Sequence, residues 1–244
     1  MEALKNLIYQ WADDQMLVGH RNSEWAGIGP VLEEDIAYAS MAQDKIGHAL
    51  ALYNLMHTEM GEQDPDTIAF SRTAAEWKNS VINELMTDDY GFSLVRHFLF
   101  DYLELIRFEG LKNSSNEGLA NLARRFHSEI KYHVMHGDIW MKQLANGTEE
   151  SKARIQDALN KSFEYLGQWF TAVEGEQTLI DQGIFEGTAS LQAKWETLIG
   201  DKLEEYGLTM PTIGNKGVYG HTADLQQLLD EMTEVYQLDP SAEW

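Results

Sequence analysis

The chain has 244 residues, of which 43% are hydrophobic and none is cysteine. This length and apolar content suffice for one core of ordinary size, so we expect a single domain over residues 1–244. The lack of cysteine excludes disulfides, thiolate metal sites and thiol nucleophiles, and it fits a reducing cytoplasm, where we expect the protein. Because no apolar run reaches the roughly 18 residues of a membrane span, a membrane is not an expected partner.

The formal net charge is −22 at pH 7. An average field of this sign repels phosphate backbones, so nucleic acid is not an expected partner either. A strongly acidic surface keeps a monomer soluble, but it also fits a basic partner protein. Composition does not separate these two interpretations, and we take the solvated surface as the default.

The first two predicted helices come from apolar residues that recur at three and four positions. The first helix is expected over residues 2–20, with Leu4 and Leu7 near one stripe. Pro30 then restarts the chain, because a missing N–H costs nothing in the first turn of a helix. A second helix over about 30–60 follows, with three acidic residues in its first turn that favour the helix dipole.

The rest of the chain continues the helical pattern after one long connection. Residues 62–90 show no sustained period, so we expect a connection with short pieces of structure that crosses one end of a bundle. Asn or Ser in the segment 113–116 can cap the fourth helix, and Asn146-Gly147-Thr148 ends that helix and caps the fifth. The third to seventh helices are expected over residues 92–112, 117–144, 149–173, 190–206 and 222–238.

Two long helix pairs joined by a crossover predict an all-α fold: a ferritin-like four-helix bundle with a crossover connection and additional C-terminal helices. The bundle core is expected over about residues 2–173, and the C-terminal helices over about 174–244. No segment alternates strongly enough to predict a strand.

Bundles of this type often hold two metal ions through Glu-x-x-His pairs, because residues three apart share one helix face. No histidine of this chain follows a carboxylate at that spacing. At a spacing of four, Asp44 precedes His48 and Glu129 precedes His133. Pairs of this kind arise by chance in so acidic a chain, and we first interpret each as an ion pair or hydrogen bond within one helix. A displaced metal site of these four residues is the alternative.

Several segments resemble one known family. They are Gly19-His-Arg-Asn-Ser-Glu-Trp25, Gly29-Pro-Val-Leu-Glu-Glu-Asp-Ile-Ala37, Gly217, Gly220-His221-Thr222, Glu231-Met232, Pro240 and Trp244. In this order, and over the whole chain, they resemble the C subunits of ring-1,2-phenylacetyl-CoA epoxidase, also called phenylacetate-CoA oxygenase. No single segment is diagnostic, and the likeness depends on their joint order and the matching length.

The resemblance implies a ferritin-like chain that supports a homologous catalytic A subunit, in which a di-iron site is held. That subunit has the pattern Gln-Asp-Glu-x-Gly-His on its second helix. The matching string here runs from Gln43 to His48, so His48 remains and Lys45 replaces a ligand glutamate. An ammonium does not ligate iron unless it loses its proton. No cofactor is therefore expected in this chain.

Three further positions of the catalytic pattern can be matched through the resemblance. Its Glu-Glu-x-x-His corresponds to Glu129-Ile-Lys-Tyr-His133, where Ile130 replaces a ligand glutamate. Asp101 falls on a carboxylate ligand of the third helix. Gln15 matches the ligand of the first helix, or Asp14 does if the alignment shifts by one.

The matched positions therefore describe a degenerate metal site. We predict that the Lys45 ammonium replaces the metal charge and pairs in the core with Asp101, with Asp14 considered as a second partner. The pairing would keep the remaining carboxylate from being buried alone.

The expected function, implied by the resemblance, is a non-catalytic structural subunit of a multicomponent monooxygenase that epoxidises phenylacetyl-CoA in phenylacetate catabolism. The expected partner is the homologous catalytic subunit, and self-association and contact with acyl-CoA stay open. The sequence leaves two alternatives. One is a stand-alone helical binding or storage protein; the other is an active di-metal oxidase or oxygenase that uses Asp44, His48, Asp101, Glu129 and His133.

Overall fold

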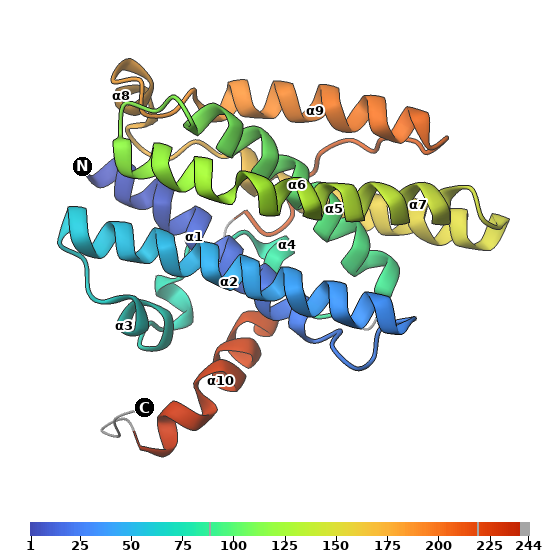
Figure 1. Cartoon of the computed structure of the whole chain (residues 1–244), viewed down its shortest axis with the longest axis horizontal. Coiled ribbons are helices and arrows are strands. Elements are labelled where there is room, and N and C mark those ends of the chain that lie inside the picture. Colours follow the sequence, from blue (N-terminus) through green and yellow to red (C-terminus); the bar gives the residue numbers. More distant parts are fainter. Residues whose placement is uncertain (88, 219, 240–244) are drawn as a thin grey trace.

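The computed structural model describes residues 1–87, 89–218 and 220–239. Every regular element in these ranges is a helix, which confirms the predicted all-α fold (Figure 1). Helices α1 (Glu2–Ser23) and α2 (Leu32–Met60) pack along each other as one pair, and α5 (Tyr90–Leu111) and α6 (Glu117–Ala145) as a second pair. The two pairs form a four-helix bundle in which α2 contacts α6 and α1 contacts α5.

The connection between the two pairs contains short helices, as predicted. They are α3 (Pro65–Phe70), a 3₁₀ turn (Ala74–Glu76) and α4 (Val81–Glu84). Two consecutive buried acids of α1 hold this crossover in place. Asp13 accepts two hydrogen bonds from the Arg72 guanidinium, at 2.7 and 2.9 Å, and one from the Lys78 backbone N–H. Asp14 accepts one from the Ser80 backbone N–H at 2.7 Å.

Local capping signals place the helix boundaries of the second pair. The Asn116 side chain accepts the Leu119 N–H at 2.8 Å, and the Thr148 side chain accepts the Ser151 N–H at 3.0 Å. Both caps were expected from the sequence, because these side chains satisfy N–H groups that lack a helical partner. The second helix starts at Leu32 rather than at Pro30, with Val31 as its N-cap.

The fifth predicted helix ends much earlier than residue 173. Helix α7 (Glu149–Phe163) ends where its last carbonyls accept hydrogen bonds from a loop far along the sequence. Gly214 N–H donates to Phe163 O, and Lys216 N–H donates to Glu164 O, both at 2.8 Å. The chain then forms a 3₁₀ turn (Leu166–Phe170). A bond from a segment so far along the sequence leaves no local signal, so the boundary was beyond sequence analysis.

The C-terminal helices extend the core of the bundle. Helix α8 (Glu176–Asp181) was not predicted, whereas α9 (Thr188–Glu205) and α10 (Ala223–Leu238) match two predicted helices. Helix α9 lies along α5, and α10 projects from the bundle beside α3 and α4 (Figure 1). One cluster of buried apolar side chains reaches from α1 to α10. Pro240 and Trp244 lie outside the described residues.

None of the described helices combines the length and the apolar character needed to cross a membrane.

Trp195 joins α9 to the bundle, so its removal tests the packing of the C-terminal part. The side chain is fully buried, and its Nε1–H donates to Leu99 O at 3.0 Å. We expect Trp195→Ala to lower the free energy of unfolding by roughly 3–5 kcal/mol in urea titrations followed by circular dichroism. Thr197→Ala, on the exposed side of the same helix, should change it by less than about 0.5 kcal/mol. Equal effects of both variants would contradict this packing.

Candidate functional site

The centre of the bundle holds a buried ion pair between Lys45 of α2 and Asp101 of α5. The distance from Lys45 Nζ to Asp101 Oδ1 is 2.5 Å, and neither side chain is exposed to solvent. The ammonium also lies 4.8 Å from the centre of the Phe100 ring, which adds a cation–π attraction. The structure thus brings together the two residues that the sequence analysis paired.

Two histidines complete the surroundings of Asp101. His97 Nε2 lies 2.9 Å from Asp101 Oδ2, and His133 Nδ1 lies 3.8 Å from Oδ1. Burial alone would raise the pKa of Asp101, but the neighbouring His97 and the Lys45 ammonium outweigh it and hold this pKa below its usual range. Burial lowers the pKa of His97 to about 4, against the opposing effect of Asp101. At neutral pH His97 is therefore uncharged.

Asp14 does not serve as a second partner of Lys45. Its carboxylate accepts hydrogen bonds from the Ser80 N–H and from Asn83 Nδ2, both at 2.7 Å, and thus faces the crossover. Burial raises the pKa of Asp14 to about 7. The consideration of Asp14 as a partner was wrong because α1 directs this side chain toward residues 80–83 instead of toward α2.

Gln15 contacts a buried acid that the sequence analysis missed. Its side-chain amide donates to Glu104 of α5, which also forms an ion pair with Arg107. Burial raises the pKa of Glu104, while Arg107 and Lys45 oppose this effect. A signal was available, because Asp101, Glu104 and Arg107 are spaced by three in an otherwise apolar helix and so share one face.

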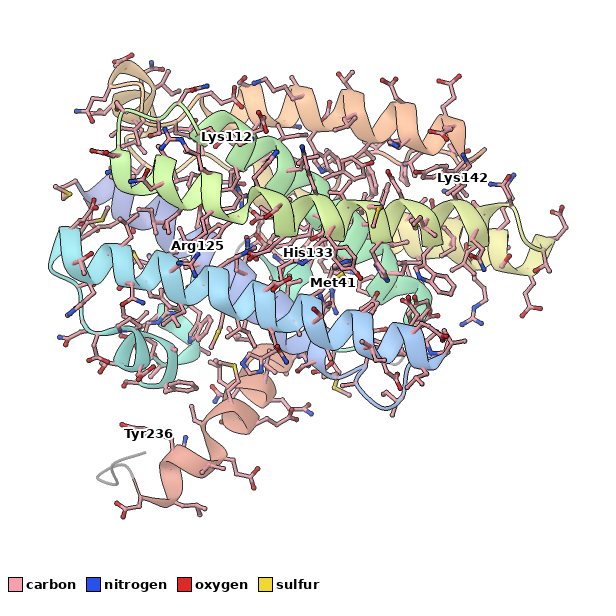
Figure 2. All side chains as sticks on the ribbon, viewed as in Figure 1. Met41, Lys112, Arg125, His133, Lys142 and Tyr236 are labelled. Atoms are coloured by element: carbon pink, nitrogen blue, oxygen red, sulfur yellow. The ribbon has the colours of Figure 1, made fainter. Side chains whose placement is uncertain are left out.

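The two histidine–acid pairs predicted within single helices are instead crossed between α2 and α6. His48 Nε2 of α2 lies 2.7 Å from Glu129 Oε2 of α6, and His133 Nε2 of α6 lies 3.0 Å from Asp44 Oδ2 of α2. The within-helix interpretation was wrong because α2 and α6 run antiparallel. Each imidazole therefore contacts the carboxylate of the neighbouring helix instead of the one on its own helix. Figure 2 shows His133 where α2 and α6 pass each other.

The imidazoles of the crossed pairs are buried, and their carboxylates lie nearer to solvent. His48 stacks on Phe126 with 4.0 Å between ring centroids. Burial, followed by the charge of Lys45, lowers the pKa of His48 well below its usual value. Ile130, between Glu129 and His133 in sequence, is fully buried and offers only hydrocarbon at a position where the catalytic pattern has a ligand.

A second polar group extends the core toward the N-terminal end of α2. Glu34 accepts a hydrogen bond from Tyr90 Oη at 2.5 Å, and His136 Nε2 lies 3.0 Å from its other oxygen. Burial would raise the pKa of Glu34, but the bonds from His136 and Tyr90 outweigh it and lower this pKa. The rings of His136 and His97 are 5.6 Å apart, so this group adjoins the Asp101 cluster. The sequence suggested only a helix-dipole role for Glu34.

The potential metal donors do not converge on a common point. Each carboxylate meets either Lys45 or a histidine, and among the described residues no group of three or more His, Asp and Glu side chains is placed to hold a metal ion. A di-metal bundle needs four carboxylates and two histidines directed at one centre. The side chains present do not fit that arrangement, and two of the matched positions are a cation and a hydrocarbon. The donors in question are Asp44, His48, Asp101, Glu129 and His133.

Together these features define a ferritin-like bundle whose centre is closed by an ion pair and by imidazole–carboxylate pairs. The family described as phenylacetic acid catabolic protein matches residues 1–244, so the chain belongs to this family. The chain is 28% identical over 250 residues to the C subunit of 1,2-phenylacetyl-CoA epoxidase from Escherichia coli (strain K12), with 100% of both chains covered. The resemblance stated from the sequence is thereby confirmed.

A double-mutant cycle tests the coupling of Lys45 and Asp101. Lys45→Met or Asp101→Asn alone should cost roughly 3–5 kcal/mol of unfolding free energy, because each leaves the other charge buried without its partner. The double variant should recover a large part of the sum. Urea titration of the four proteins gives the coupling energy. Single effects that add within about 0.5 kcal/mol would show that the two charges do not interact.

The depressed pKa of His97 predicts a pH-dependent stability contribution. Between pH 6.5 and pH 4 the unfolded chain binds a proton at this histidine and the folded chain does not, so acidification through this range destabilises the fold through His97. The unfolding free energy of the wild type minus that of His97→Gln should fall by about 2–3 kcal/mol from pH 7 to pH 4. A difference that stays constant over this range would refute the assignment.

Proposed function

We propose that this chain is a non-catalytic subunit of a multicomponent monooxygenase that epoxidises phenylacetyl-CoA in phenylacetate catabolism. In this role it binds and supports a homologous catalytic chain that carries the di-iron site. The proposal is supported by the family membership over residues 1–244 and by the end-to-end similarity to a chain named as an epoxidase subunit. A cytoplasmic location is part of the proposal and agrees with the absence of cysteine.

The ion pair of Lys45 and Asp101 is the observation that carries this proposal. In a di-metal bundle, the bound ions supply the positive charge that balances the inward-facing carboxylates. Here the ammonium of Lys45 supplies a positive charge at the buried Asp101 and is covalently part of the chain. A core balanced in this way can fold without metal, which suits a supporting subunit and leaves the chemistry to the partner.

The active di-metal alternative requires a rearrangement of the crossed pairs. Asp44 and Glu129 would have to leave His133 and His48 and turn inward together, while Lys45 would have to withdraw from Asp101. A stand-alone storage protein would not need similarity over its full length to a chain named as one subunit of an epoxidase. Both alternatives make different predictions from the proposal for metal content and for complex formation.

Metal content and complex formation together test the proposal. The chain expressed alone in iron-rich medium should hold far less than one iron or manganese per chain by elemental analysis, because Lys45 and Ile130 replace ligands. The catalytic subunit expressed in the same medium is the positive control. The two chains mixed at micromolar concentration should elute together in size-exclusion chromatography.

The outcomes separate the three candidate functions. Near-stoichiometric metal in the lone chain, lost in a His48→Ala/His133→Ala variant, would support the active di-metal alternative. A metal-free chain that elutes separately from the catalytic subunit would support the stand-alone alternative.

A further inference from the structure

The outward side of α2 carries almost no charge for most of its length. Between residues 32 and 54, Glu33 is the one exposed charged residue among the described side chains, while Asp35 and Asp44 are half-buried. Leu32 and Ile36 are 68% and 63% exposed. In a chain with 24% charged residues, the solvent side of a surface helix is expected to carry charged and polar side chains rather than exposed Leu and Ile. The exposed residues of this stretch are Leu32, Glu33, Ile36, Ser40, Gln43, Gly47, Leu50 and Asn54.

Helix α6 adds a stripe of uncharged exposed side chains, although Arg125 and Lys131 are exposed beside it. Ser128, Tyr132, Met135 and Ile139 are exposed at spacings of four and three, so they form a stripe along one side of the helix. Tyr132, Met135 and Ile139 are 45%, 50% and 55% exposed. The crossed pairs bind α6 to α2, which makes the two stripes neighbours in one face. We call it the α2–α6 face, and both helices lie at the front of the view in Figure 1.

The seam of the α2–α6 face carries few charges and is open to close approach at Gly47. Arg125 of α6 is exposed there and lies close enough to Glu129 to act on its charge. Asp44 and Glu129 are the acids at the seam, and each is paired with a buried histidine. A Cβ atom built on Gly47 would meet no atom within 4 Å, so the helix has a shallow notch there into which another helix can pack. Two neighbouring helices with exposed apolar side chains and such a notch can pack against the helices of another bundle.

The size of the α2–α6 face fits a stable protein interface. The stripe on α2 is about 33 Å long at 1.5 Å per residue, and two packed helices together are about 20 Å wide. The resulting area of roughly 650 Å² approaches the about 800 Å² per partner of a standard interface.

Charge decides between the two helical partners that could cover this face. A second copy would bring another net charge of −22 against the first, and the mostly apolar stripes of the face offer few charges to offset that repulsion. A different bundle with a less acidic surface meets no such cost. We infer that the α2–α6 face is the docking surface for a helix pair of the homologous catalytic chain; this inference rests on the proposed function.

The inference is tested with charged substitutions on the face and matched ones elsewhere. Gly47→Glu and Met135→Glu each place a carboxylate in the proposed interface without touching the core. The control, Val235→Glu, places one on α10 outside the interface, where Val235 is 56% exposed. Binding of each purified full-length chain to the catalytic chain is measured by calorimetry. Each face variant should weaken binding about tenfold or more, and the control should stay within about twofold. Melting curves should show that all three variants are folded.

The outcomes distinguish the inference from the function on which it rests. If the wild type binds and the face variants bind equally well, the docking surface is wrong while the proposed function stands. If the wild type does not bind the catalytic chain at all, the proposed function fails and the inference fails with it. If light scattering shows a wild-type dimer that Met135→Glu separates, while binding to the catalytic chain is unchanged, the face belongs to a second copy and the inference is overturned.

Discussion

Lys45 and Asp101 place two opposite charges at a point of the bundle that water does not reach. Each ion alone would lose several kcal/mol of hydration there, so neither is tolerated without the other. The positions of α2 and α5 are therefore tied to each other through a contact with little geometric freedom, at 2.5 Å. The neighbouring polar groups, His97 and His133, are arranged around this pair and not around one another.

The crossed imidazole–carboxylate pairs extend the same constraint from α5 to α6. His133 approaches Asp101 on one side and contacts Asp44 on the other, so α2, α5 and α6 meet through one histidine. The carboxylates that lie nearer to solvent, Asp44 and Glu129, are paired with buried histidines, so neither is left without a partner at the surface. The polar core and the α2–α6 face are thus linked, since the histidines that surround Asp101 also bind the two carboxylates at the seam of that face.

The sequence predicted what depends on near neighbours along the chain. The helix pairs, the crossover and the caps at Asn116 and Thr148 followed from spacing and from residue chemistry within a few positions. The juxtaposition of Lys45 with Asp101 was anticipated through the family resemblance, because no spacing rule links residues on two helices. Its meaning as a substitute for metal charge stays a prediction.

What the sequence could not supply depends on partners far along the chain. The exchange of partners between the two histidine–acid pairs required the relative direction and register of α2 and α6. The early end of α7 required the loop that holds Gly214, and the contact of Gln15 with Glu104 required the packing of α1 on α5. In each case the partner lies on another element, far along the sequence, where spacing on a single helix gives no information.

The two consecutive acids of α1 also bear on the order in which the chain can assemble. Asp13 and Asp14 bind residues 72–83, and all of these groups lie within the first 84 residues, before α5 is synthesised. The first helix pair can therefore fold with its crossover already attached as the chain leaves the ribosome from its N-terminus. The second helix pair would then pack against a first pair whose crossover is already fixed. The crossover topology, as opposed to a simple up-and-down bundle, would thus be set before half of the chain is synthesised.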